Sequence, residues 1–365
     1  MPEATVEIRE AVNAPDAADM PLLFDLRIDD PHSAAARNRT DWMPKARFGL
    51  MVHWLYPNTA PAPGQPASDR NDAEDFNAVV DDFDVDRFLA DFDASGADFL
   101  MFTTGQNSGY YISPNRVLEH HAGPNHTSRR DLLLEIASGV RSLEKRFIAY
   151  LPSEVHFQSE SIREAFAWNP HDQTEFQRRY TAFIREYSER LGSRLDGWWF
   201  DGCYDWEFFH HSLYDWRQWC DAARAGNPDA AIAFNDGSFY LRKLLPVSPY
   251  QDYLSGEIGL LQDGQIRLGR ETETEGTGEL YLPSQRYVPG TFCQWHGQVP
   301  IDCLWVYGGG AMPAPRYTDA ELLAFLRHCR SVGGVVTFNV GIYRDGRLAE
   351  ETVAQLRRIA CALDA

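Results

Sequence analysis

Short apolar runs and amphipathic segments alternate along most of the chain. The run from Leu195 to Gly202 carries three consecutive aromatic residues between two glycines, and this predicts a short strand buried on both faces, as in a parallel sheet. The same reasoning predicts strands at residues 47–54, 97–104, 146–151, 231–237, 253–255, 290–306 and 333–341. Apolar positions at helical spacing predict helices at residues 86–95, 131–143, 174–191, 320–332 and 350–363. The proline-rich stretch 57–75 predicts an irregular loop.

The order of these elements predicts the fold class. Strands and helices alternate about eight times, which indicates parallel βαβ units. At 365 residues, a closed (β/α)8 TIM-like barrel of the α/β class fits better than an open sheet, since such a barrel needs roughly 250 residues plus insertions. We find no internal repeat and no second domain. We therefore predict a single barrel domain at residues 41–365, preceded by an N-terminal arm at residues 1–40.

Polar residues stand where several predicted strands end. In a barrel the carboxyl ends of the strands share one face, so these side chains converge on one pocket. Asp201 ends the aromatic strand, where it either carries catalysis or closes a turn. His53 ends the first strand and is either a ligand contact or a core histidine bonded to a carbonyl. Gln106 and Asn107 lie in the polar loop after the second strand.

Charge and cysteine content exclude several classes of function. The formal charge of −19, from 53 acidic and 34 basic residues, argues against nucleic acid or anionic membranes as partners. No apolar run reaches the roughly 18 residues of a membrane span, and the polar first residues do not resemble a signal peptide. The six cysteines form no CxxC pair, which is typical of free thiols in a reducing compartment. We expect a cytoplasmic protein.

The sequence offers no cofactor motif. Neither a glycine-rich phosphate loop nor a metalloprotease or calcium-binding motif is present, and His120, His121 and His126 fit a solvated loop better than a metal site. Paired carboxylates remain as candidates for catalysis. Two carboxyl groups in different environments can act one as nucleophile and the other as proton donor. Glu257 is the best partner for Asp201, although by itself it also fits an exposed loop acid. We expect neither metal nor cofactor.

Five segments together resemble a known family. They are residues 45–54, which end in His-Trp, residues 86–104, which end in Thr-Thr, residues 129–131 with 148–154, residues 196–202, and residues 333–346 with Gly-Gly, Asn-Val-Gly and Asp-Gly. In this order they resemble glycoside hydrolase family 29, the retaining α-L-fucosidases. The resemblance covers roughly residues 42–363, and residues 196–202 and 333–346 are its most specific parts.

The resemblance implies roles for individual residues. It implies a retaining glycosidase for an α-L-fucoside or a related α-L-sugar, with Asp201 as the nucleophile. Glu257 becomes the acid/base, because residues 252–257 have the form Asp-aromatic-x-Ser-x-Glu, similar to an Asp-aromatic-x-Thr-x-Glu stretch of some members. The carbohydrate partner is expected to contact His53, Trp54, Gln106, Asn107 and Trp199.

The sequence departs from the family where the sugar is recognised. Gln106 to Tyr110 replace a His-His-Asp-Gly-Phe stretch, and Gly237 stands in the place of an arginine after Asn235-Asp236. A changed hydrogen-bonding shell changes the sugar that binds well, because unmatched buried polar groups are costly. Two other hypotheses therefore stay open: a carbohydrate-binding protein without turnover, and a barrel enzyme with other chemistry on a sugar-like metabolite.

Overall fold

The computed structural model describes residues 38–58, 61, 73–204, 213–237, 244–258, 260–262, 265–267 and 282–364. Within these ranges seven parallel strands form one curled sheet in the order β5-β4-β3-β2-β1-β9-β8. The strands are β1 (Gly49–Val52), β2 (Phe99–Thr103), β3 (Arg146–Pro152), β4 (Gly197–Asp201), β5 (Ala231–Phe234), β8 (His296–Pro300) and β9 (Val335–Val340). Two short strands, β6 (Leu260–Gln262) and β7 (Gln265–Arg267), pair separately. The arm at residues 1–40 lies almost wholly outside the described residues.

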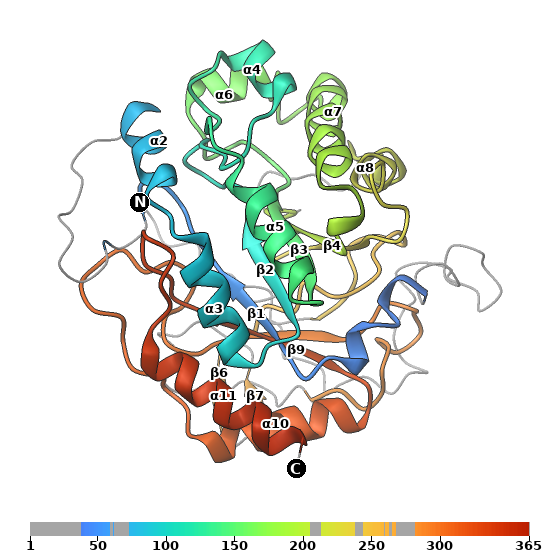
Figure 1. The fold of residues 1–365 in the computed structure, drawn as a ribbon. Helices are drawn as coiled ribbons and strands as arrows, with labels where there is room; N and C mark the ends of the chain where they lie inside the picture. The colour runs from blue at the N-terminus through green and yellow to red at the C-terminus, as the bar shows by residue number, and fades with distance from the viewer. Residues whose placement is uncertain are drawn as a thin grey trace, which may run out of the picture.

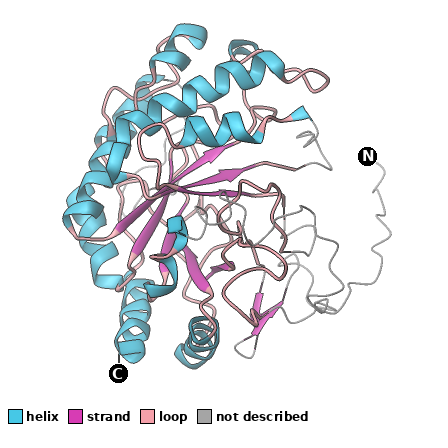
Figure 2. Ribbon diagram, turned by 90° about the vertical axis from the view of Figure 1, so that its right-hand side faces the viewer, coloured by secondary structure: helices cyan, strands magenta, loops and turns pink. Residues whose placement is uncertain are grey.

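Helices cover the outer face of the sheet, as Figures 1 and 2 show. The five predicted helices are confirmed within two residues at each end, and no described helix is long and apolar enough to cross a membrane. They are α3 (Val85–Ser95), α5 (Leu132–Ser142), α7 (Thr174–Leu191), α10 (Asp319–Ser331) and α11 (Glu350–Asp364). Several begin at a capping side chain, such as Asp84 for α3 and Thr318 with Glu321 for α10, which satisfies backbone N–H groups of the first turn.

Four short helices in the described ranges were not predicted. They are α2 (Ala73–Asp81), α4 (Arg116–Ala122), α6 (Glu160–Ala165) and α8 (Trp216–Ala223), together with the 3-10 turns η1 (Met43–Lys45) and η2 (Gly192–Arg194). Helices this short show too few turns for a periodic pattern to emerge. Because α2 begins at Ala73, the predicted irregular loop at residues 57–75 was wrong in its last residues.

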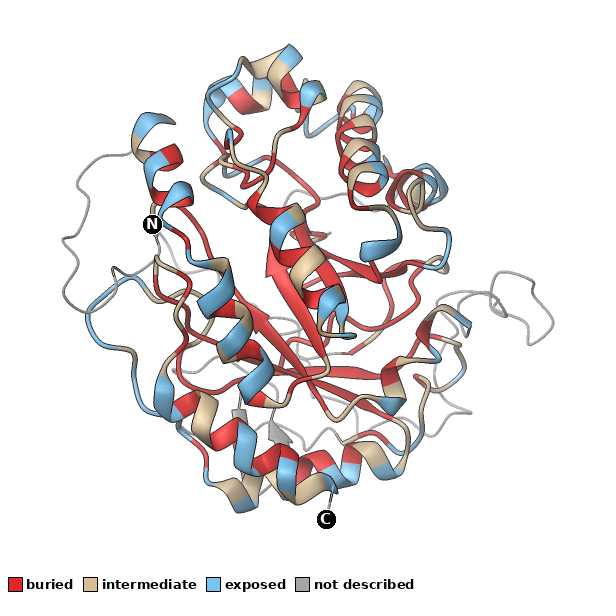
Figure 3. Cartoon of the chain, in the orientation of Figure 1, coloured by how far each residue is buried: buried red, intermediate tan, exposed pale blue. Residues whose placement is uncertain are grey.

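Alternate side chains of each strand enter two different cores. Met51, Met101, Tyr150 and Trp199 belong to an inner cluster enclosed by the curled sheet. The next residue along, Trp198, belongs to the outer cluster between sheet and helices, and its indole N–H donates to the carbonyl of Ala223 in α8. Figure 3 shows the strands of the seven-stranded sheet as buried along almost all of their length and the helices as buried on their inner side. The strands therefore read as unbroken apolar runs because both of their faces are covered.

The segment from Asp252 to Ile258 lies between β5 and β8. Its backbone bonds to β5 through Asp252 N and the Ile232 carbonyl at 2.8 Å, and to β8 through Gln298 N and the Gly256 carbonyl at 2.6 Å. The predicted strand at residues 253–255 was wrong in form, since the segment makes isolated bridges rather than a regular ladder. Gly256 adopts φ +75°, which interrupts extended pairing. The described architecture is thus an α/β fold whose seven-stranded sheet forms half of a barrel.

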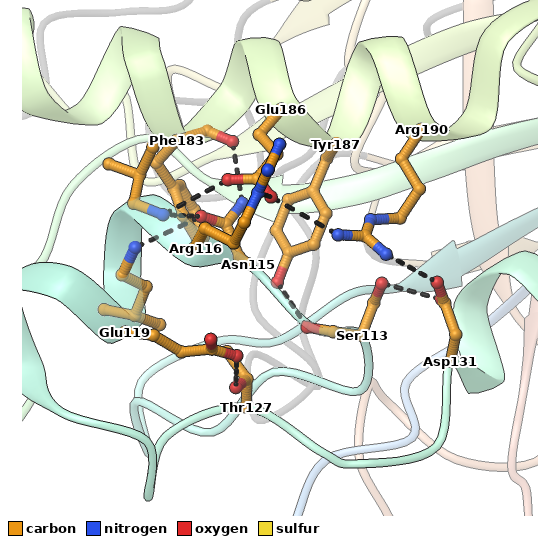
Figure 4. Close-up of polar contacts among 12 residues, drawn as sticks. Ser113, Asn115, Arg116, Glu119, Thr127, Asp131, Phe183, Glu186, Tyr187 and Arg190 are labelled. Atoms are coloured by element: carbon orange, nitrogen blue, oxygen red, sulfur yellow. Dashed lines mark hydrogen bonds and ion pairs between the residues drawn. The ribbon is translucent and has the colours of Figure 1, made fainter.

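The long connection after β2 is fixed to α7 by buried polar contacts (Figure 4). Tyr187 donates to the Ser113 carbonyl at 2.9 Å, and the Asn115 amide donates to the Phe183 carbonyl at 3.0 Å. Arg190 bonds to Asp131 at 3.2 Å, at the start of α5. These contacts hold residues 104–131 against the helical layer, and that connection carries Gln106 at its beginning.

Candidate active site

The polar residues singled out in the sequence lie at the carboxyl ends of the parallel strands. Asp201 is the last residue of β4, and His53 directly follows β1. Gln106 follows β2, and Glu257 lies in the segment between β5 and β8. Since all seven strands run in parallel, these ends meet at one edge of the curled sheet.

The carboxylate of Asp201 accepts four hydrogen bonds from four different parts of the chain. Oδ1 accepts from the Asn235 amide at 2.8 Å and from the Tyr204 hydroxyl at 3.0 Å. Oδ2 accepts from the Gln106 amide at 3.0 Å and from the Tyr150 hydroxyl at 2.5 Å. Four polar groups thus surround the carboxylate and fix its orientation at the tip of β4.

Glu257 experiences the opposite environment. Its side chain is only 8% exposed. Burial raises the pKa of Glu257 well above the usual value, the charge of Asp201 raises it further, and a hydrogen bond from Asn235 opposes the shift. The negative charge of Asp236 adds to the increase. Such surroundings favour the protonated form of the carboxyl group, and Asn235 contacts both acids.

His53 is held as a neutral ring by a hydrogen bond to Asn339. The Asn339 amide donates to the Leu304 carbonyl at 3.0 Å, so its oxygen accepts from His53 Nδ1 at 2.9 Å. Burial lowers the pKa of His53 to about 4, against smaller opposing effects of Asn339 and Asp201. The proton of the neutral ring therefore sits on Nδ1, and Nε2 is a hydrogen-bond acceptor.

The other predicted contacts occupy different positions. Trp54 is 1% exposed; its indole N–H donates to the Arg344 carbonyl at 2.9 Å, and its ring packs edge-on against Phe83 in the outer layer. Trp199 is also 1% exposed and lies in the inner core. Asn107 is exposed, and its side chain makes no hydrogen bond to the described residues. Sugar contact by these three residues stays a prediction.

Tertiary contacts add residues that sequence reasoning had not singled out. Tyr150 and Tyr204 bond to Asp201, and Asn339 orients His53. Trp305 is half-buried, with its ring 6.0 Å from that of His53. Asn339 stands within the Gly-Gly…Asn-Val-Gly segment, which is the one signal that could have pointed to it. In the part of the chain that the structure describes, no group of three His, Cys, Asp or Glu residues is placed to hold a metal ion.

The sequence matches the family model described as alpha-L-fucosidase over residues 69–364. The chain belongs to the alpha-L-fucosidase family. The resemblance identified from the motif segments is therefore confirmed, and with it the assignment to a family of glycosidases. No curated protein sequence matches the chain.

Solved structures of glycosidases share this fold. The endo-fucoidan hydrolase MfFcnA4 from glycoside hydrolase family 107 aligns with a TM-score of 0.62 at 17% identity, covering 92% of this chain and 55% of that one. Alpha-L-fucosidase isoenzyme 1 from Paenibacillus thiaminolyticus aligns with a TM-score of 0.61 at 16% identity, covering 91% of this chain and 76% of that one. The chain thus spans about half the length of the fucoidan hydrolase. A variant of alpha-L-fucosidase AlfC in complex with Fuca(1,6)GlcNAc aligns with a TM-score of 0.54 at 14% identity, covering 90% and 98%.

Proposed function

We propose that this member of the alpha-L-fucosidase family is a retaining glycoside hydrolase acting on α-L-fucosides or a related α-L-sugar. One observation carries the proposal: two carboxyl groups on neighbouring parts of the sheet edge share the Asn235 amide but have opposite surroundings. Asp201 is surrounded by hydrogen-bond donors, whereas Glu257 is buried beside another negative charge. Such a pair divides into an ionised nucleophile and a protonated acid.

The two carboxyl groups act together in each of two steps. An oxygen of Asp201 attacks the anomeric carbon while the Glu257 proton passes to the glycosidic oxygen, so that the bond to the leaving alcohol breaks. A glycosyl ester on Asp201 results. Water then attacks the same carbon, Glu257 takes its proton, and the ester bond breaks, which restores both carboxyl groups.

Two hydrogen-bond acceptors of fixed orientation recognise the sugar. The Gln106 amide nitrogen is committed to Asp201, which leaves its oxygen as an acceptor, and His53 offers Nε2. Both require a hydroxyl donor from the sugar. Because Gln106 replaces a histidine of the related motif, we expect the preferred hydroxyl pattern to differ from fucose, or fucose to bind weakly. Trp54, Asn107 and Trp199 complete the proposed contacts.

We further propose that residues 41–365 form one closed (β/α)8 barrel. The hydrogen bonds of the segment from Asp252 to Ile258 to both β5 and β8 support this, because they span the gap between the two outermost strands of the described sheet. In a closed barrel, the strand of Glu257 lies beside β5, so that only β5 separates it from β4, which carries Asp201.

A panel of nitrophenyl α-L-glycosides tests the function. We expect hydrolysis of one or more of them, with the first-formed sugar detected by proton NMR in the same anomeric configuration as the substrate. A 2-deoxy-2-fluoro glycosyl fluoride of the preferred sugar should label the peptide that contains Asp201, as read by mass spectrometry. Inverted product, or label on a different carboxylate, would contradict the mechanism. Sugar binding with no turnover on any substrate would favour a binding protein instead.

A further inference from the structure

The peptide carbonyl of Ser255, close to Glu257 in sequence, is bonded from two sides of the inner core. The indole N–H of Trp199 donates to this oxygen at 3.0 Å. His296 Nδ1 lies 3.2 Å from it and 3.0 Å from the Leu254 carbonyl. We propose that Trp199 is a positioning residue, which holds the Glu257 segment in the buried site through this bond. The inference rests on the proposed function and gives Trp199 a role in addition to the sugar contact expected from the sequence.

Trp199 connects the two carboxyl groups through one rigid pair of rings. Its ring stacks on that of Tyr150, with centroids 5.1 Å apart and planes at 16°. The Tyr150 hydroxyl donates to Asp201, while the Trp199 N–H holds the segment of Glu257. Since Trp199 is 1% exposed and both rings lie in the packed inner core, neither can turn without displacing its neighbours. The positions of nucleophile and acid are thereby linked.

On its other side, the segment of Glu257 packs closely against β8. Gly256 lies so close to β8 that a Cβ atom there would stand 2.3 Å from the His296 carbonyl. Its φ of +75° is a left-handed conformation that favours glycine. His296 is fully buried, and its Nε2 accepts from Thr337 at 2.7 Å. The segment therefore cannot move toward β8, and without the Trp199 bond it can move outward from the inner core.

Such a movement changes the surroundings of the acid. The groups that face Glu257 are Asp201 of β4, Asn235 and Asp236 after β5, Tyr150 of β3, and Tyr204. Burial is the largest cause of the raised pKa of Glu257, and the charge of Asp201 is the second. A segment that moves toward water loses both effects in part, so the pKa falls and the proton is lost at lower pH.

The test compares two neighbouring tryptophans of the same strand. Trp199→Phe removes the N–H and keeps a ring to stack on Tyr150. Trp198→Phe is the matched control, because Trp198 is equally buried and donates to a backbone carbonyl at 2.8 Å, but on the outer face. We expect Trp199→Phe to move the alkaline limb of kcat/KM down by about one pH unit. kcat should fall about tenfold, as for one lost hydrogen bond. In Trp198→Phe both should stay at wild-type values.

A second measurement does not depend on turnover. The infrared band of the protonated Glu257 carboxyl, assigned by its loss in Glu257→Gln, is titrated with pH in wild type and in each variant. Equal midpoints in Trp199→Phe and Trp198→Phe would overturn the inference, even if wild type hydrolyses its substrate normally. If Trp199→Phe does not fold, Trp199→Tyr removes the same N–H and keeps a ring beside Tyr150; a lowered midpoint supports the inference and an unchanged one overturns it. Absence of any hydrolysis by wild type would count against the proposed function alone.

Discussion

The amide nitrogen of Gln106 donates to Oδ2 of Asp201 at 3.0 Å, across 95 positions of sequence. A residue expected to contact the sugar thus also bonds to the proposed nucleophile. We expect Gln106→Ala to lower kcat/KM by about 10- to 150-fold, because hydrogen bonds to charged groups are worth roughly 1.5–3 kcal/mol. Steady-state kinetics on the preferred glycoside measures this. Gln218→Ala on the exposed side of α8 is the control, and efficient hydrolysis of aryl α-L-fucosides unchanged in Gln106→Ala would refute this role.

Asp236 should raise the pKa of Glu257, the proposed acid, without taking part in the reaction. Its negative charge raises the pKa of Glu257. In the proposed mechanism Glu257 acts in its protonated form, so activity should be present below this pKa and be lost as pH rises through it. Asp236→Asn removes the charge at constant shape. We therefore expect the alkaline limb of kcat/KM to move to lower pH by less than about one unit. An alkaline limb that stays at its wild-type pH in Asp236→Asn would exclude this coupling. A shift of the same size in the surface control Asp229→Asn would exclude it as well.

Two buried histidines should make the fold sensitive to mild acid. Burial lowers the pKa of both His53 and His296 to about 4, whereas an unfolded histidine titrates near 6.5. The unfolded chain thus binds protons that the native state does not, so stability is complete above about pH 6.5 and falls as pH drops toward 4. The loss approaches about 3 kcal/mol per histidine.

Thermal unfolding between pH 7 and pH 4 measures this effect. His296→Gln should flatten the dependence of the melting temperature on pH, because it removes one of the two titrating groups. His120→Gln, a change on the exposed surface of α4, should leave the wild-type slope. Equal slopes in wild type and His296→Gln would show that His296 does not titrate over this range.

A buried ion pair should fix the segment of Glu257 to the sheet. Asp252 is fully buried, bonded to Arg224 at 2.5 Å and to the Ile232 N–H at 2.8 Å. Arg224→Met leaves this carboxylate with the more distant Arg39, 3.4 Å away, so we expect a loss of about 3 kcal/mol in the free energy of unfolding, the lower end for a broken buried pair. Urea unfolding gives the value. Arg178→Met, at an exposed pair with Glu175, should change little, and a similar small effect of Arg224→Met would contradict the prediction.

Local pattern alone determined much of the architecture. The unbroken apolar runs, the five longer helices and the place of Asp201 at a strand tip all follow from periodicities of a few residues. The family could be recognised for the same reason, since its motifs are short segments at these strand ends. Short helices such as α6 (Glu160–Ala165) escaped prediction because too few turns repeat.

Only the tertiary structure decided the chemical state of the site. The donors to Asp201 come from positions 95, 51 and 34 residues away in the chain, as well as from Tyr204, and Asn339 lies 286 residues from His53. From its sequence context Glu257 fitted an exposed loop acid, yet the fold buries it beside Asp201. A carboxyl group titrates according to its burial and its neighbouring charges. Both depend on which strands lie side by side, and no local pattern of residues specifies that.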